Sequence, residues 1–169
     1  CGGADCDGGT PTCPSGNISD CLNAVSASAT VPTSANKVDI LFVIDNSGSM
    51  QAQIQEIANR FPNFITSLGN IDWQVCVTTT DTRANPQNYY EGTDGRLRRF
   101  PNGSKVISKN TQNGQSQFTG LLSTMVTEVN QGLGSGNERG ILAINRALDR
   151  KEGCFRQGAA LHTVVLSDE

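Results

Sequence analysis

The sequence has little of what marks nucleic-acid-binding, membrane-spanning and many catalytic proteins. Its 169 residues include only one histidine, aromatic residues make up 5%, and 13 lysines and arginines stand against 16 aspartates and glutamates. Without a basic stripe or interleaved aromatics, we expect no nucleic-acid partner. We interpret the cluster of Arg96, Arg98 and Arg99 as a solvated loop face. No run is long and apolar enough to predict a transmembrane segment.

The scarcity of histidine also limits the catalytic options. His162 lies inside an apolar run, so we interpret it as a core or edge residue rather than as the base of a serine hydrolase. The glycines at 132–136 are not followed by Lys-Ser or Lys-Thr, which excludes a Walker-type phosphate loop. A metal hydrolase built from Asp45, Glu138 and Asp168 would lack a separate general base. We therefore expect no enzymatic activity.

The number of cysteines is high for a cytosolic protein. There are six cysteines, which indicate an oxidising compartment and therefore an exported protein. Four crowd a segment rich in glycine, proline, serine and aspartate: Cys1, Cys6, Cys13 and Cys21. We expect disulfides there rather than zinc, because no Cys-x-x-Cys pair is present. Cys76 and Cys154 lie in the body of the chain and could pair with each other.

The amino terminus suggests processing. The chain begins at Cys1 without an initiator methionine, which a removed signal peptide would explain. Cys1 could form an ordinary disulfide or carry a lipid anchor, as in bacterial lipoproteins; both alternatives stay open. We expect residues 1–36 to be a cysteine-rich leader and linker, and residues 37–169 to be the globular domain, located outside the cell, at its surface or in the bacterial envelope.

Hydrophobic periodicity predicts alternating strands and helices in that domain. Strands are expected at 38–44, 73–80 and 162–166, and helices at 51–68, 116–130 and 138–150. This alternation is typical of parallel β-α-β units, so we predict an α/β fold with a doubly wound, mostly parallel sheet. Pro62 should kink or split the first helix. A hairpin between 97–100 and 105–108, turning at Asn102-Gly103, is also expected.

One junction carries most of the functional information. The apolar run 38–44 leads directly into Asp45-Asn46-Ser47-Gly48-Ser49, which places one carboxylate and two hydroxyls at the end of a buried strand. Open α/β sheets bind ligands at such strand ends. An oxygen-only set suits a hard divalent cation such as Mg²⁺. A plain turn with a helix cap is the alternative. We reject an EF-hand loop, because Met50 stands where that loop needs glycine.

With these residues in view, the chain resembles von Willebrand factor A domains with a metal-ion-dependent adhesion site. The signature is VDILFVIDNSGSM at 38–50, with further similarity in VCVTTTD at 75–81 and VVLSDE at 164–169. The resemblance implies a doubly wound fold in which Asp45, Ser47 and Ser49 bind Mg²⁺, or Ca²⁺ or Mn²⁺ in its place. It also implies that Asp168 reaches the metal through water.

Two features depart from the family pattern. Glu138 falls closest to the position where the family has a threonine ligand. Its negative charge would lower the affinity of the bound ion for an external carboxylate. Members also continue past the fourth strand, whereas this chain stops at Glu169. We therefore expect a bare sheet edge. A second polypeptide, such as the C-terminal part of the same precursor, would complete the fold, unless those elements are simply missing from this sequence.

The resemblance implies an adhesion or ligand-binding module of an exported or surface-anchored bacterial protein. The cation held by Asp45, Ser47 and Ser49 would accept a carboxylate from a protein ligand or surface receptor. The alternative is a structural subunit of a surface filament or envelope assembly, in which the metal only stabilises the turn.

Overall fold

The computed structural model describes residues 36–84 and 91–168. The predicted leader, with its four cysteines and the fate of Cys1, lies outside this part of the chain except for Asn36. The division into leader and domain therefore stays a prediction. None of the helices within the described ranges is both long and apolar enough to cross a membrane.

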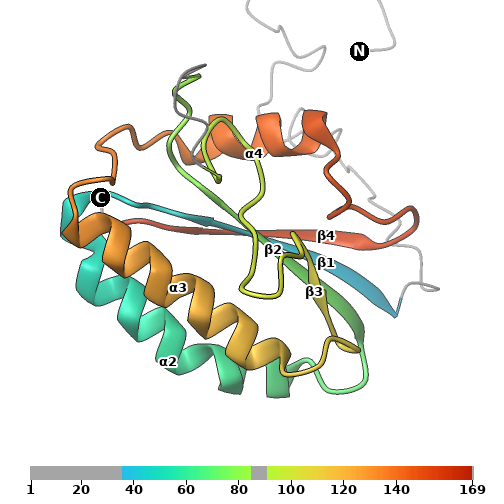
Figure 1. The fold of residues 1–169 in the computed structure, drawn as a ribbon. Helices are drawn as coiled ribbons and strands as arrows, with labels where there is room; N and C mark the ends of the chain where they lie inside the picture. Colours follow the sequence, from blue (N-terminus) through green and yellow to red (C-terminus); the bar gives the residue numbers. More distant parts are fainter. Residues whose placement is uncertain (1–35, 85–90, 169) are drawn as a thin grey trace, which may run out of the picture. The chain divides into compact units, whose positions relative to one another are not determined.

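A four-stranded, mostly parallel open sheet forms the centre of the domain (Figure 1). The strands are β1 (Lys37–Ile44), β2 (Asp72–Thr79), β3 (Ile107–Ser108) and β4 (Ala160–Leu166). β1 pairs in parallel with both β2 and β4, whereas the short β3 pairs antiparallel with β2, which gives the order β3-β2-β1-β4. The predicted α/β class and the parallel strand pairing are confirmed.

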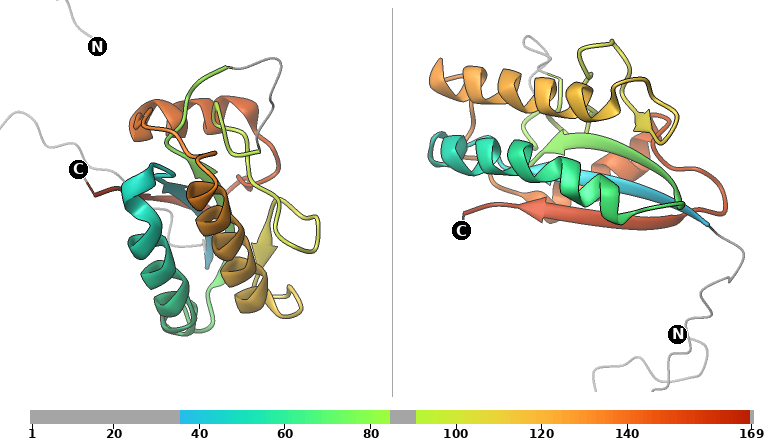
Figure 2. Two further views of the ribbon diagram at one scale, coloured as in Figure 1. Left: turned by 60° about the vertical axis from the view of Figure 1, so that its left-hand side comes forward. Right: turned by 90° about the horizontal axis from the view of Figure 1, so that it is seen from below.

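Helices cover both faces of this sheet. In Figure 1, α2 (Gln51–Ser67) and α3 (Gly114–Asn130) lie below the sheet and α4 (Gly140–Arg150) lies above it. Two further views show the same three layers (Figure 2). A 3-10 turn, η1 (Gly48–Met50), joins β1 to α2. Each predicted helix is present, with ends that differ by no more than two residues from the expected ones.

Burial of β1 on both faces explains these layers. Ile40, Phe42 and Ile44 pack into a core with α2 and α3, whereas Leu41 and Val43 pack on the opposite side with α4. Alternate side chains of a strand point to opposite faces, so a continuous apolar run needs cover on both. The run at 38–44 therefore forms the buried strand that the sequence predicted, and this strand has a neighbour on each side.

Two local predictions differ from the structure. Pro62 does not split α2, because the proline removes only one backbone donor while the apolar face of the helix stays packed on the sheet. The kink stays a prediction. The turn at Asn102-Gly103 does form, with Phe100 N–H donating to Ser104 O (2.8 Å), but residues 97–100 are not a strand. The short segment after the turn, β3, pairs with β2 instead.

The interpretation of the arginine cluster as a solvated face is wrong for one member. Arg98 is only 7% exposed. Its guanidinium forms a forked ion pair with the Glu128 carboxylate of α3, at 2.8 and 2.9 Å. This ion pair compensates the cost of burying the Arg98 charge. Because its two residues are 30 positions apart, no local sequence pattern predicts it.

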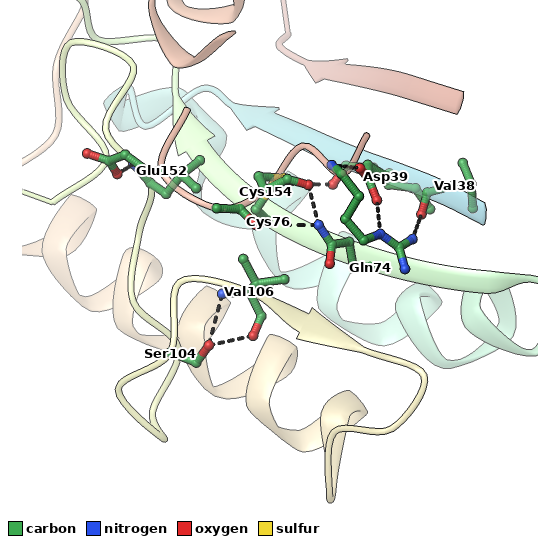
Figure 3. Close-up of a disulfide and its surroundings, with 12 residues drawn as sticks. Val38, Asp39, Gln74, Cys76, Ser104, Val106, Glu152 and Cys154 are labelled. Atoms are coloured by element: carbon green, nitrogen blue, oxygen red, sulfur yellow. Dashed lines mark hydrogen bonds and ion pairs between the residues drawn. A yellow bond between two sulfur atoms is a disulfide. The ribbon is translucent and has the colours of Figure 1, made fainter. Parts of the chain in front are cut away.

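The predicted pairing of Cys76 with Cys154 is confirmed (Figure 3). It joins β2 to the segment that leads into β4. The side-chain amide of Gln74 donates to Cys154 O beside it, as the same view shows. Arg156 follows and forms ion pairs with Asp39 (2.7 Å) and Asp72 (2.8 Å). Burial tends to lower the pKa of Arg156, but its hydrogen bonds to these two carboxylates outweigh that effect and raise it.

Replacing both cysteines with alanine should lower the free energy of unfolding by about 2–4 kcal/mol, because the bond closes a long loop. The two residues are separated by 78 positions and both are fully buried. Urea unfolding under oxidising conditions tests this, since the other four cysteines then stay as they are. A loss below about 1 kcal/mol would contradict the prediction.

Candidate metal centre

Asp45 lies where β1 ends, and its side chain organises the turn that follows. Its Oδ1 accepts the Ser47 N–H at 2.7 Å, and its Oδ2 accepts the hydroxyl of Ser167 at 3.0 Å. The Ser47 and Ser49 hydroxyl oxygens are 3.0 Å apart. The predicted carboxylate and both predicted hydroxyls are therefore gathered at one turn.

Backbone hydrogen bonds bring the segments after β4 and β2 to this turn. Asp45 N–H donates to Leu166 O at 2.9 Å, which fixes the end of β4 against it. Thr80 N–H donates to Ile44 O at 3.2 Å and fixes the segment after β2. Because β1, β2 and β4 are parallel, their carboxyl ends share one edge of the sheet.

The loop between α3 and α4 is pressed onto the same turn. Ser135 N–H donates to Asn46 O at 3.2 Å. A Cβ at Gly134 would lie only 2.1 Å from that oxygen, so the close approach requires glycine. The Arg139 N–H then donates to Thr80 O (3.1 Å), which holds the start of α4 at this edge.

Glu138 and Asp168 are placed by these loops. Glu138 is half-buried and directly precedes Arg139, while Asp168 is exposed and lies two residues beyond β4. Within residues 36–84 and 91–168, no group of three or more histidine, cysteine, aspartate or glutamate side chains is gathered as a metal site. The carboxylates do not form a cluster on their own, and the five-residue ligand set stays a prediction.

The electrostatics of Asp45 are unusual for a buried carboxylate. The residue has no exposed surface. Asp45 forms no ion pair within the described part of the chain, where the ion pairs involve other carboxylates. There, its charge is compensated by two neutral donors, the Ser47 N–H and the Ser167 hydroxyl. A buried charge is costly unless it is paired or coordinates a metal.

Two oxygens beside the turn are also left without partners. Asn46 Oδ1 and Thr80 Oγ1 are buried, and neither has a hydrogen-bond partner among the described residues. Buried polar atoms of this kind usually bind an ordered water or an ion. The donor set therefore fits a hydrated hard cation.

The helix-cap interpretation explains only part of the geometry. The bond from Ser47 N–H to Asp45 is an Asx turn, which a plain connection could also form. However, Ser47 makes no side-chain cap to η1, and its hydroxyl forms a hydrogen bond with that of Ser49 instead (3.0 Å). Capping thus accounts for the carboxylate, whereas the two hydroxyls bond each other.

Sequence reasoning missed several residues of this site, among them Ser167 and Gly134. Ser167 holds the outer oxygen of Asp45, and its place directly after an apolar strand was the available signal. Gly134 makes the loop contact, but a glycine-rich stretch does not reveal which glycine is pressed against a carbonyl.

Comparisons with known proteins add no assignment. No family model, no curated protein and no solved structure matches the chain.

Gly134→Ala should lower the free energy of unfolding by about 1–3 kcal/mol, because the added methyl group collides with Asn46 O. Gly136→Ala is the matched control, since a Cβ there would meet nothing within 4 Å. Urea unfolding of both variants measures the difference. Equal stabilities would show that the loop is not pressed onto the turn.

Proposed function

We propose that the turn at Asp45 binds a divalent cation and that the domain is a cation-dependent ligand-binding module. One observation carries the proposal: a fully buried carboxylate, whose hydrogen-bond donors among the described residues are all neutral, lies beside two neighbouring hydroxyls. A cation there would compensate Asp45 and give both serine oxygens a common partner.

The spacing of the hydroxyls is compatible with Mg²⁺. Adjacent ligands of an octahedral Mg²⁺ bound at about 2.1 Å lie about 3.0 Å apart. The Ser47 and Ser49 oxygens, which form a hydrogen bond with each other, have the same separation, 3.0 Å, so both could bind the ion without moving apart. Ca²⁺ binds at longer distances, although a contribution from Glu138 would shift the preference toward it.

The chain's own residues supply one charge and several neutral oxygens. When bound, the cation would offer its remaining coordination positions to a carboxylate of a partner protein. Ser49 is exposed at the open side of the turn, while Asp45 and Ser47 are buried beneath it. This arrangement supports the resemblance to von Willebrand factor A domains, with Asp168 and Glu138 as further ligands at the rim.

A structural role is the second candidate. Both Asp45 oxygens already accept hydrogen bonds from within the chain, which would let an ion stabilise the turn without an outside ligand. In that case the domain would be a subunit of an exported assembly. The buried disulfide supports export in both cases.

Mg²⁺ should raise the melting temperature of the protein by several degrees, because a ligand at a hundred times its Kd stabilises the folded state by about 2.7 kcal/mol. Asp45→Asn should abolish this shift. In metal-free buffer the same variant should be as stable as the unaltered protein or more so, since it removes a buried charge that forms no ion pair among the described residues. Thermal melts with EDTA, Mg²⁺, Ca²⁺ or Mn²⁺ measure both effects.

Asp149→Asn is the matched control, because Asp149 is an exposed aspartate of α4. It should keep the full metal-dependent shift. A shift that survives in Asp45→Asn would rule out the proposed site.

Ligand binding separates the two candidate functions. Immobilised peptides with aspartate or glutamate, and the same peptides with asparagine or glutamine, serve as probes. If the domain is a binding module, only the immobilised acidic peptides should retain it, and EDTA should release it. Metal binding without any such preference would favour the structural subunit.

A further inference from the structure

Asp45 has a hydroxyl-bearing neighbour on each side. β1 pairs with β4 and with β2 up to Ile44. One residue further along each strand, Ser167 follows β4 and Thr80 follows β2, so Asp45 lies between them. Two backbone hydrogen bonds continue the pairing to this point: Asp45 N–H donates to Leu166 O at 2.9 Å, and Thr80 N–H donates to Ile44 O at 3.2 Å.

The side chains of Asp45 and Thr80 belong to the same face of the sheet, the one that α4 covers. Val43 of β1 and Cys76 of β2 pack in the core on that face. Because alternate residues of a strand share a face, counting on from these two residues places both Asp45 and Thr80 there. Thr80 Cγ2 supports this placement, since it lies 3.9 Å from where a Cβ of Gly140, at the start of α4, would be.

The two neighbours of Asp45 interact with it differently. The Ser167 hydroxyl donates to Asp45 Oδ2 at 3.0 Å. Thr80 Oγ1 is buried and has no hydrogen-bond partner within residues 36–84 and 91–168. A buried hydroxyl next to a buried carboxylate ordinarily donates its proton to that carboxylate, because an unmade hydrogen bond is costly. The arrangement therefore points to another partner for the oxygen of Thr80.

We propose that Thr80 Oγ1 is a direct ligand of the divalent cation that Asp45 binds. The inference rests on the proposed cation site and adds a ligand to it. Neither the turn at 45–49 nor the position of Glu138 indicates this ligand. It comes from β2, and only the parallel pairing of β2 with β1 brings it next to Asp45.

Thr80 suits this role because its position is fixed and its side chain is neutral. Its N–H donates to Ile44 O, and its C=O accepts the Arg139 N–H at 3.1 Å. The side chain is also buried, so little ordering is needed when the ion binds. Unlike Glu138, a hydroxyl adds an oxygen without negative charge, so the ion keeps more attraction for the carboxylate of a partner protein. This ligand therefore favours the binding module over the structural subunit.

An ordered water is the alternative partner of Thr80 Oγ1. The two alternatives differ in what Thr80→Val does, because this substitution replaces the hydroxyl with a methyl group of similar size. Loss of a ligand weakens cation binding, whereas loss of a hydroxyl bonded only to water leaves it unchanged.

Calorimetric titration of the full chain with Mg²⁺, Ca²⁺ and Mn²⁺ identifies the ion that binds most tightly. For that ion, the Kd of Thr80→Val should be at least about tenfold higher than that of the unaltered protein. In EDTA the same variant should melt at the same temperature or higher, since it removes a buried hydroxyl without a partner in the described part of the chain. Thr80→Ser keeps the oxygen and should keep the Kd within about threefold.

Thr78→Val is the matched control, because Thr78 belongs to the same strand and the same face. Its hydroxyl is bonded to Gly92 O and Arg96 O, at 3.0 and 2.9 Å. Thr78→Val should therefore lower the melting temperature in EDTA and leave the Kd of the cation unchanged. Circular dichroism checks that every variant folds.

The outcomes separate this inference from the proposed function. If the unaltered protein binds the cation and Asp45→Asn does not, the cation site stands. A folded Thr80→Val whose Kd then rises less than about tenfold overturns the role of Thr80 alone, and a water bonded to Thr80 would give that result. If the unaltered protein binds none of the three ions, the cation site and the role of Thr80 are both overturned.

Discussion

Parallel hydrogen bonding of β1 on both of its sides is the constraint on which the rest of the molecule depends. It forces the chain to return to the same end of the sheet after every strand, so each crossing needs a helix. It also collects the carboxyl ends of β1, β2 and β4 at one edge. The functional argument follows from this topology, because residues as distant as Asp45 and Ser167 become neighbours only there.

The proposed site illustrates how a fold can hold charge in an apolar setting. β1 is buried along almost its whole length and ends on a carboxylate that has no exposed surface. Neutral donors from the turn orient Asp45 but leave its charge in place. In physical terms, the proposed cation would compensate a charge that the interior cannot hold cheaply.

Periodic features were predictable from the sequence, whereas long-range polar contacts were not. The strands, the helices and the Cys76–Cys154 bond follow from hydrophobic spacing and from the chemistry of an oxidised chain. The burial of Arg98 depends on a glutamate of another element, which no local pattern encodes. Likewise, the turn at Asn102-Gly103 could be recognised, but its pairing partner is set by the neighbouring edge of β2.

The position of the disulfide has a mechanical consequence. Cys154 lies shortly before β4, and Cys76 lies in the middle of β2, so a covalent bond on the α4 side ties the segment that leads into β4 to the interior strand on the other side of β1. Separation of β4 from β1 would therefore release β4 but stop at Cys154, because the chain there is bonded to β2. The chain before Cys154, including α4, would stay attached to the interior strand even after β4 had come away.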